Sequence, residues 1–411
     1  MKTDVDSLMG AHNLDALLVI GSALHNPDMV YFTGIVHVTH ADLIKKRGEA
    51  PVLFHGSMER DEAAKTDLRT KDLGAYNYRD LLSQAGGDHI RARALRYQKV
   101  LNELGITSGR VAVSGMTDLG PALAVFSELQ KLMPGLTVIG ENDSVLLQAR
   151  TTKDEAEIEQ MRQIGRITTD VVGKTANFLT SRKAKDGVLM QTDGQPVTIG
   201  AVKKQIDLWL AEAGAENPEG TIFAIGRDAG VPHSSGTASD ILRLGQTIVF
   251  DIFPCQAGGG YFHDLTRTWC LGYAPAEVQA LYEDVLAVYR QMIAELKLNT
   301  PCPHYQERTC EMFEAKGYPT IRTDPQTERG YVHSLGHGLG LAVHEAPWAG
   351  LNAGERDILA PGVVWTVEPG LYYPERGMGV RLESSVWMRP DGQPEILGEY
   401  PLDLVLPVRS R

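Results

Sequence analysis

Residues 333–345 have the sequence HSLGHGLGLAVHE, which combines three histidines with three glycines. Glycine weakens the interior of helices and strands because it loses the most backbone freedom on folding. The glycines therefore exclude the stable helix on which His333 and His337 would form an i, i+4 zinc pair. We expect a glycine-rich strand or loop instead, with its backbone close to other parts of the chain.

A predicted β-hairpin in residues 247–269 carries two aspartates. Two apolar runs flank a glycine-rich turn at 255–260, and counting back from the turn places Asp251 opposite Asp264. Opposed side chains share one face of a sheet at about 5 Å, where like charges are destabilising. One carboxylate stays protonated, or a cation lies between them. A bulge that shifts the register would instead leave both aspartates exposed, and this hairpin alone favours that alternative.

A second predicted hairpin, in residues 366–388, repeats the arrangement with glutamates. Its turn lies at 374–377, and the same counting places Glu368 opposite Glu383. Pro369 and Gly370 make this register less secure. Two hairpins that each oppose two acids nevertheless argue for bound metal.

Four carboxylates and one histidine of the glycine-rich segment suit two hard or borderline divalent ions better than a thiolate zinc site. Four negative charges would balance two divalent cations, and such a pair, about 3.5–4 Å apart, activates a bridging water. We expect Mn²⁺ first, with Zn²⁺ or Co²⁺ as chemically acceptable alternatives.

The chain is expected to contain two domains with a boundary near Arg150. In residues 1–150, helical stretches such as 92–105 alternate with strands, which indicates an α/β domain. The strands are predicted at 14–21, just before Gly34, at 51–54 and at 110–114.

Residues 151–411 are expected to form a second, α+β domain. It begins with a long helix for which Thr152 is the predicted cap, with Glu155 three residues later in a capping-box pattern. Strands and turns follow residue 220, interrupted by a helix at 275–296, and His304 is placed in a loop.

Composition excludes several classes of protein. The formal net charge of −12, without a Lys/Arg cluster, disfavours nucleic-acid binding because phosphate contacts need cations. We find no apolar run of membrane-spanning length and no signal-peptide pattern at the start. The four cysteines lack a CxxC spacing and indicate reduced thiols in a cytoplasmic protein.

Five motifs of the second half are similar to those of the methionine aminopeptidase/Xaa-Pro peptidase family, the pita-bread metallopeptidases (M24). They are PHSSG at 232–236, DIFP…HDLTRT at 251–268, HSLGHGLGLAVHE at 333–345, TVEPGLY at 366–372 and VRLES at 380–384. Each motif alone is weak, but all five occur in the family's order across residues 150–405. The first half resembles, through NLDALLVIG and YFTG, the N-terminal domain of the creatinase/prolidase branch.

The resemblance implies a pita-bread domain at 151–411, with the metals in the cavity of a curved antiparallel sheet. It also implies the metal ligands, of which Asp264 and Glu383 would bridge the two ions. The full set is Asp251, Asp264, His337, Glu368 and Glu383.

The resemblance also implies catalytic roles for residues around the metals. His233 and His344 would position the scissile carbonyl and stabilise the tetrahedral intermediate formed by a metal-bound hydroxide. Glu368 would carry the proton of the attacking water toward the leaving nitrogen. Tyr372 matches a tyrosine tied to proton shuttling, although packing explains it equally well. Arg381 would orient the ligands.

Substrate-pocket residues are less certain from the motifs. His333 resembles a histidine that lines the pocket after the scissile bond, and packing is an equal alternative. Trp348 stands where several related dipeptidases have an arginine for the substrate carboxylate, and Arg356 is a candidate replacement. His37, in the loop after YFTG, is a candidate to reach a neighbouring subunit's site, although an exposed loop histidine is the simpler explanation.

The expected function is that of a metal-dependent Xaa-Pro dipeptidase (prolidase), with a homodimer implied by the resemblance. An Xaa-Pro aminopeptidase acting on longer peptides is the close alternative. A non-catalytic binding module on the same scaffold is a third, which the complete ligand set argues against.

Overall fold

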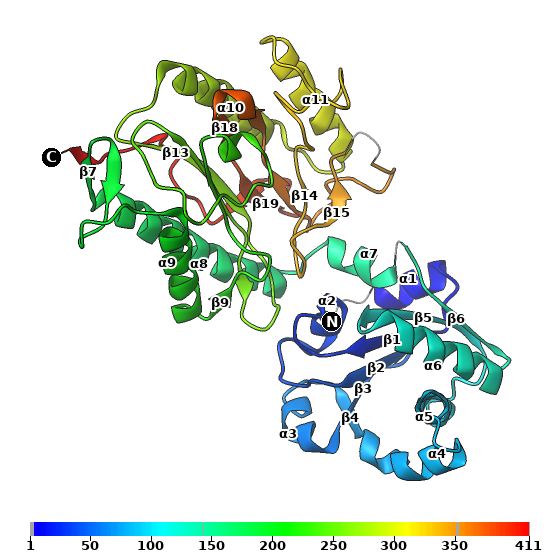
Figure 1. Ribbon diagram of the computed structural model, residues 1–411. Helices are drawn as coiled ribbons and strands as arrows, with labels where there is room; N and C mark the ends of the chain where they lie inside the picture. The colour runs from blue at the N-terminus through cyan, green and yellow to red at the C-terminus, as the bar shows by residue number, and fades with distance from the viewer. Residues whose placement is uncertain (1–3, 143, 351–352, 411) are drawn as a thin grey trace. The chain divides into compact units, whose positions relative to one another are not determined.

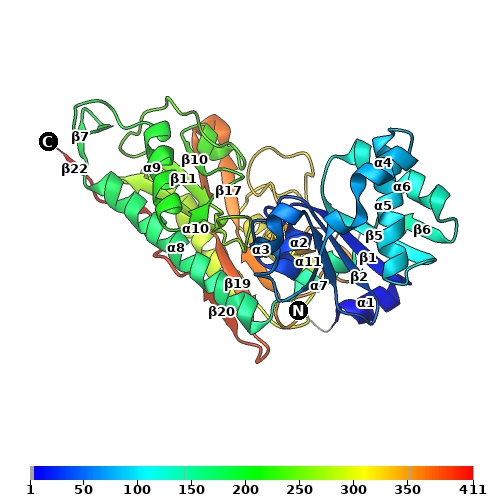
Figure 2. The same ribbon diagram turned by 90° about the horizontal axis from the view of Figure 1, so that it is seen from below.

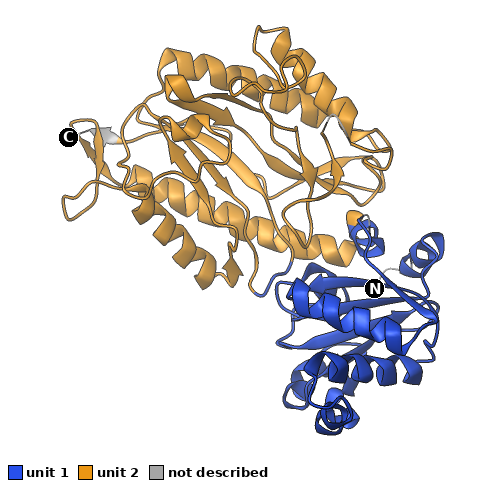
Figure 3. Cartoon of the chain, turned by 45° about the vertical axis from the view of Figure 1, so that its right-hand side comes forward, with its two compact units in different colours: residues 1–150, 258–260 blue, residues 151–257, 261–411 orange. Residues whose placement is uncertain are grey.

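The computed structural model describes residues 4–142, 144–350 and 353–410. The chain divides into two compact units (Figure 3). Unit 1 comprises Met1–Arg150 with Gly258–Gly260, and unit 2 comprises Thr151–Ala257 with Tyr261–Arg411. None of the helices in the described part of the chain has the length and apolar character that a membrane span requires.

Unit 1 is built on a six-stranded sheet with the order β4-β3-β2-β1-β5-β6. All strands run parallel to β1 except β2, which is antiparallel to both of its neighbours. The strands are β1 (Ala16–Gly21), β2 (Ala41–Lys46), β3 (Val52–His55), β4 (Arg69–Asp72), β5 (Gly109–Met116) and β6 (Leu136–Ile139).

Helices cover both faces of this sheet (Figures 1 and 2). Apolar residues of α1, α2 and α7 pack in one core, and those of α5 and α6 pack in the other. The helices are α1 (Val5–Ala11), α2 (Pro27–Thr33), α3 (Arg60–Ala63), α4 (Tyr78–Gln84), α5 (His89–Glu103), α6 (Leu119–Leu132) and α7 (Val145–Thr151). The α/β class predicted for this half is confirmed.

The short strand predicted before Gly34 is wrong, because the structure has helix α2 there. Pro27 occupies the first turn, where its missing N–H costs nothing. Met29, Val30 and Thr33 are its buried residues, a spacing that matches one face of a helix.

The described residues of unit 2 form five sheets, and the largest has the order β15-β14-β16-β19-β20. A four-stranded sheet has the order β10-β11-β13-β21, and smaller sheets pair β12-β9, β17-β18 and β22-β7-β8. Pairing is antiparallel except for β13-β21 and β22-β7. The strands are β7 (Lys183–Lys185), β8 (Val188–Met190), β9 (Ala215–Glu216), β10 (Ile222–Ile225), β11 (Thr247–Ile252), β12 (Cys255–Gln256), β13 (Leu265–Leu271), β14 (His337–Gly338), β15 (Glu345–Trp348), β16 (Val364–Val367), β17 (Gly370–Tyr373), β18 (Met378–Arg381), β19 (Ser384–Met388), β20 (Pro394–Leu397), β21 (Val405–Leu406) and β22 (Arg409–Ser410).

Four long helices complete unit 2 and divide its apolar interior into two cores. One core joins α8 and α9 to the four-stranded sheet, and the other joins α10 and α11 to β16–β19. The helices are α8 (Glu155–Thr180), α9 (Ile199–Glu212), α10 (Ala276–Glu295) and α11 (Cys302–Glu314). Short 3₁₀ helices lie in both units. They span Ser57–Glu59 and Leu73–Tyr76 in unit 1, and Asp228–Gly230 and Pro374–Arg376 in unit 2.

Two predicted details of these helices are wrong. The cap of α8 is Asp154, whose side chain accepts a hydrogen bond from the Glu157 backbone while Glu157 accepts one from the Asp154 backbone. Thr152 is unavailable as a cap because it forms a β-bridge with Val363. His304 lies in α11, which starts after Pro301, rather than in a loop.

The glycine-rich segment forms no helix, as predicted, and its glycines permit close backbone approach. A Cβ atom at Gly336 would lie 1.9 Å from the carbonyl oxygen of Thr366, and one at Gly338 would lie 2.0 Å from that of Ala346. These glycines allow His337 to be held directly against the backbones of β15 and β16.

Gly338→Ala is therefore expected to destabilise the protein by about 2 kcal/mol or more, because the methyl group must displace the β15 backbone. Gly10→Ala, in α1 where a Cβ meets no atom within 4 Å, is the matched control and should leave stability unchanged or slightly higher. Chemical denaturation measures both. Equal midpoints for Gly338→Ala and the wild type would contradict the steric argument.

Candidate metal centre and active site

The five predicted ligands come from the strand ends of two neighbouring sheets. Asp251 is the next-to-last residue of β11, and Asp264 immediately precedes β13. The remaining three belong to the larger sheet, where His337 begins β14, Glu368 follows β16 and Glu383 precedes β19. The Glu383 backbone N–H donates to the Thr266 carbonyl oxygen at 3.1 Å, which joins the two sheets at this point.

The register of the first acidic hairpin differs from the prediction by two residues. Asp251 pairs with Thr266, and Asp264 lies beyond the last ladder pair, Ile252 with Leu265. The chain after β11 does not turn back at once, because Cys255–Gln256 pairs with β9 instead. Since side chains alternate with a period of two, a shift of two residues keeps both aspartates on the same face.

The second acidic hairpin has the predicted register. Val367 pairs with Ser384 in one ladder and Gly370 with Arg381 in the next. Both pairs follow the count that places Glu368 opposite Glu383. The two glutamates lie in the break between the ladders, where Pro369 interrupts strand pairing.

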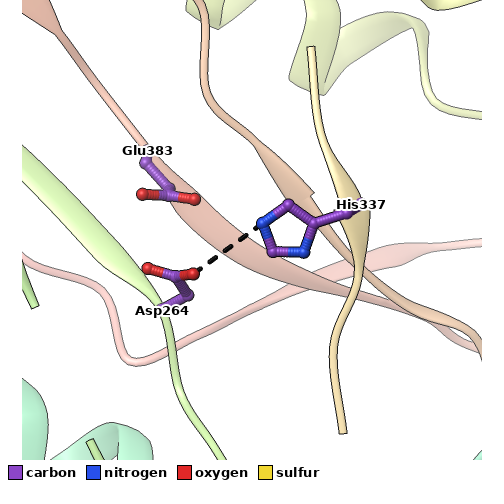
Figure 4. A group of neighbouring side chains, drawn as sticks. All are labelled: Asp264, His337 and Glu383. Atoms are coloured by element: carbon purple, nitrogen blue, oxygen red, sulfur yellow. Dashed lines mark ion pairs between the residues drawn. The ribbon is translucent and has the colours of Figure 1, made fainter. Parts of the chain in front are cut away.

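The ligand atoms of three of these residues converge (Figure 4). One atom each of Asp264, His337 and Glu383 lies within 4.8 Å of the other two, and all three residues are buried. His337 Nε2 is 3.9 Å from Asp264 Oδ2 and 3.3 Å from Glu368 Oε1. The geometry brings the predicted acids and the imidazole around one small volume.

Burial and mutual repulsion perturb the acids strongly in the absence of metal. Burial, with the charges of neighbouring carboxylates, raises the pKa of Asp264 and of Glu383 well above the ordinary values. Burial also acts to raise the pKa of Glu368, but the hydrogen bond and charge of His337 outweigh it and lower that pKa to about 2. Burial acts to lower the pKa of His337, but the hydrogen bond and the charge of Glu368 outweigh it and raise that pKa.

The residues present fit divalent metal ions. The Oδ1 atoms of Asp251 and Asp264 are buried and accept no hydrogen bond from the residues that the structure describes. Buried polar atoms without partners are rare and costly, and a divalent ion between these oxygens would satisfy both of them. His337 Nδ1 lies 3.0 Å from the Gly338 carbonyl oxygen, and donation there leaves Nε2 as a free metal ligand.

Arg381 and two threonines hold the ligands in place. The Arg381 guanidinium donates to Asp251 Oδ2 at 2.6 Å and to Thr266 Oγ1 at 3.1 Å. Thr266 donates to Glu383 Oε2 at 2.6 Å. Thr366, which sequence reasoning missed, donates to Glu368 Oε1 at 3.2 Å and accepts the His337 N–H at 3.0 Å. Its position two residues before Glu368 was the only signal available in the sequence.

A cavity of about 850 Å³ opens onto this centre. His233, His333, His344 and Trp348 line it together with all five ligands. The rings of His337 and His344 lie 4.4 Å apart between centroids. Burial lowers the pKa of His344, so its imidazole is neutral at neutral pH.

The other predicted residues lie outside the cavity wall. Tyr372 is buried and bonded through its hydroxyl to His333 Nε2 at 2.9 Å and to Arg381 Nη1 at 2.8 Å. Arg356 is exposed and absent from the described lining, so its anchoring role remains a prediction. His37 is exposed in unit 1. Lys203, Asn217 and Phe253 line the cavity and carried no sequence signal.

A buried ion pair supports the loop that carries His344. Lys153 Nζ lies 3.3 Å from Glu345 Oε2, and the two side chains are 1% and 3% exposed. Glu345 Oε1 also accepts the Ala342 backbone N–H at 3.1 Å. The residue next to His344 is thus held by a long-range pair that sequence reasoning did not find.

Removing one charge of this pair should be costly, because the other charge stays buried and loses its opposite charge. Glu345→Gln is expected to destabilise the protein by about 3 kcal/mol. Asp170→Asn, which breaks the exposed pair with Lys174, should cost less than about 1 kcal/mol. Denaturation midpoints compare the two, and similar losses would mean that the buried pair contributes no more than a surface pair.

Metal binding to the metal-free protein is expected to release protons. Asp264, Glu383 and His337 all have raised pKa values, so protons held near neutral pH must leave as an ion binds. A carboxyl group whose pKa is raised on folding stabilises the metal-free fold at low pH, and this contribution is lost as pH rises through the raised value. Metal should therefore increase the melting temperature more at about pH 8 than at about pH 6.

Calorimetry in buffers of different ionisation enthalpy measures the released protons, and melting scans measure the shift. Binding without proton release at neutral pH would contradict the raised pKa values.

The comparisons with known proteins agree with this arrangement. The model of metallopeptidase family M24 matches residues 159–390. A putative dipeptidase from Bacillus subtilis is 30% identical over 64% of this chain and 65% of its own length. An Xaa-Pro dipeptidase from Pyrococcus furiosus is 28% identical over 61% of this chain and 64% of its own length. The chain thus spans just under two thirds of the length of these relatives.

Similarity of fold extends over nearly the whole chain. The crystal structure of an X-Pro aminopeptidase from Thermotoga maritima superposes with a TM-score of 0.73 at 25% identity, covering 98% of this chain and 99% of the other. The predicted pita-bread fold and the N-terminal α/β domain are confirmed. The sequence match, together with the fold, shows that the chain belongs to metallopeptidase family M24.

Proposed function

We propose that this protein hydrolyses Xaa-Pro peptide bonds with two divalent metal ions held by the five residues described above. The observation that carries the proposal is the convergence of four carboxylates and His337 at a cavity that His233 and His344 also line. The two bound metal ions would supply an activated water and polarise the substrate carbonyl. Mn²⁺ is our first expectation for the metal, with Zn²⁺ or Co²⁺ as alternatives.

The side chains around the centre suit proton transfer and charge stabilisation. With a pKa of about 2, Glu368 is ionised at neutral pH and can accept a proton from water. The nitrogen of a peptide bond must gain a proton as the bond breaks, and the proton that Glu368 takes from the attacking water would balance this step. Glu368 would deliver it, while His233 and the neutral imidazole of His344 would donate hydrogen bonds to the carbonyl oxygen.

Proline specificity is supported by apolar surface beside the same centre. Phe253, Val343 and Trp348 line the cavity and offer contacts for a pyrrolidine ring. The names of the P. furiosus dipeptidase and the T. maritima aminopeptidase point to the same class of bond.

Dipeptide and longer substrates differ in the need to bind a proline carboxylate. The cations in the described cavity wall are Arg381, which is bonded to Asp251 and Tyr372, and Lys203, which donates to the Ser235 carbonyl oxygen at 2.5 Å. Trp348 stands where several related dipeptidases have an arginine for this carboxylate, and Arg356 remains the predicted anchor. We place prolidase activity first and aminopeptidase activity second, and the homodimer and cytoplasmic location remain predictions.

The test compares hydrolysis of Ala-Pro and Ala-Pro-Ala by the metal-loaded and the chelated protein. Metal-dependent cleavage of Ala-Pro alone would establish a prolidase, and cleavage of the tripeptide would establish an aminopeptidase. If neither is cleaved by protein with metal shown to be bound, the Xaa-Pro assignment is wrong and a binding role gains support.

A histidine variant tests the cavity arrangement in the same assay. His344→Ala should lower kcat by about 100-fold or more, as expected for a lost oxyanion donor, without changing metal content. His304→Ala removes an exposed histidine of α11 and should retain full activity. Equal activities of the two variants would remove His344 from the mechanism.

A further inference from the structure

Unit 1 contains a second cavity, of about 710 Å³, at one edge of its six-stranded sheet. Ile20 and Gly21 line it at the end of β1, and Gly56 and Thr117 line it just beyond the ends of β3 and β5. Because these strands are parallel, the cavity lies at their carboxyl edge. The start of antiparallel β2 reaches the same edge, where Ala41 pairs with Gly21.

This edge is also where the chain changes direction within the sheet. From β1 the chain continues through α2 to β2 on one side, whereas β5, on the other side, is reached only after β4, α4 and α5. In open α/β sheets, ligands bind outside the carboxyl ends of the strands at such a switch point. The position therefore favours a ligand site in a unit that supplies none of the metal ligands.

Two arginines of α5, Arg93 and Arg96, bring positive charge to this cavity. Arg96 Nε is buried without a hydrogen-bond partner among the described residues. Arg96 Nη2 approaches Asp42 Oδ2 only to 3.8 Å, beyond hydrogen-bond distance. Asp42 is instead bonded by the Tyr97 hydroxyl at 2.7 Å. The Arg96 guanidinium thus pairs with Asp42 through charge alone, and its Nη atoms donate no hydrogen bond to a described residue.

Aromatic side chains form the wall beside these arginines. Tyr78, Tyr97 and Phe126 line the cavity, and the Arg96 guanidinium lies 5.8 Å from the Tyr78 ring centroid. The rings of Tyr97 and Phe126 are 5.5 Å apart. Such a wall suits a flat or apolar body, while the guanidinium groups suit a carboxylate or phosphate.

Glu59, the other acid of the cavity lining besides Asp42, is hydrogen-bonded within its own loop. Glu59 accepts hydrogen bonds from the Thr39 backbone N–H at 2.7 Å and from its hydroxyl at 2.6 Å. Its carboxylate takes its hydrogen bonds within its own loop, so it does not occupy the donors of Arg93 or Arg96.

We propose that this cavity binds a small organic anion, with a carboxylate or phosphate on Arg96 and Arg93 and a flat or apolar body against Tyr78, Tyr97 and Phe126. The anion charge would meet a planar fork of donors, which recognises both groups through paired hydrogen bonds. The site lies within unit 1 and is independent of the peptide-bond chemistry proposed above.

The test measures binding of two probe anions to the metal-loaded full chain by calorimetry and saturation-transfer NMR. Phenylacetate represents an aromatic carboxylate and adenosine 5′-monophosphate an aromatic phosphate, with phenylacetamide and adenosine as uncharged counterparts. We expect at least one anion to bind, its uncharged counterpart to fail, and the tighter anion to identify the preferred group.

Variants separate this cavity from the metal centre, which also attracts anions. Arg96→Gln should weaken binding about tenfold or more, and Arg93→Gln should weaken it in the same direction. Arg91→Gln, on an exposed position of α5 whose side chain lies near Glu128, is the matched control and should bind as the wild type does. The proposal is overturned if neither anion binds at millimolar concentration, or if binding persists unchanged in both Arg96→Gln and Arg93→Gln. Peptide hydrolysis is not a readout here, so failure of the proposed function would leave this test unaffected.

Discussion

Mutual repulsion among buried carboxylates is the constraint on which the catalytic half of this structure depends. Asp251, Asp264 and Glu383 are buried close enough to raise the pKa of two of them well above normal. A fold that tolerates this must surround the acids with compensating charge. It does so with Arg381, which is buried and bonded to Asp251, and with His337, which pairs with Glu368.

The same repulsion links the metal centre to the chemistry that we propose. Charges that destabilise the metal-free site become favourable once divalent cations lie among them. Glu368 differs from the other acids because its partner is an imidazole, which keeps it ionised at neutral pH. The proposed cluster would therefore hold cations through its carboxylates and also move protons through Glu368. Arg381 donates to Asp251 through Nη2 and to the Tyr372 hydroxyl through Nη1. Tyr372, which also bonds His333, therefore helps to hold Arg381 in position.

Much of the catalytic domain could be predicted because strand geometry has a simple period. The Glu368 and Glu383 register followed from counting, since the turn at Pro374–Arg376 is tight and is followed by Gly377 in a left-handed conformation. Counting from the turn failed for Asp251 and Asp264, because Cys255–Gln256 leaves the hairpin to pair with β9. The shared face survived because the error was two residues. The cap of α8 was misplaced because Thr152 is held by a distant strand, and local patterns carry no information about such contacts.

The sequence by itself determined which residue types could bind metal, the turn that opposes Glu368 to Glu383, and the glycines that keep residues 333–345 out of a helix. These are properties of neighbouring residues, and they depend on backbone freedom and strand periodicity. Only the tertiary structure decided that β13 and β19 bring Asp264 and Glu383 together, that Thr366 orients His337, and that Lys153 pairs with Glu345 across 192 residues. The arginine-lined cavity of unit 1 also exists only through the tertiary structure. Contacts between residues far apart in the chain follow from how sheets and helices pack, and no local pattern encodes that packing.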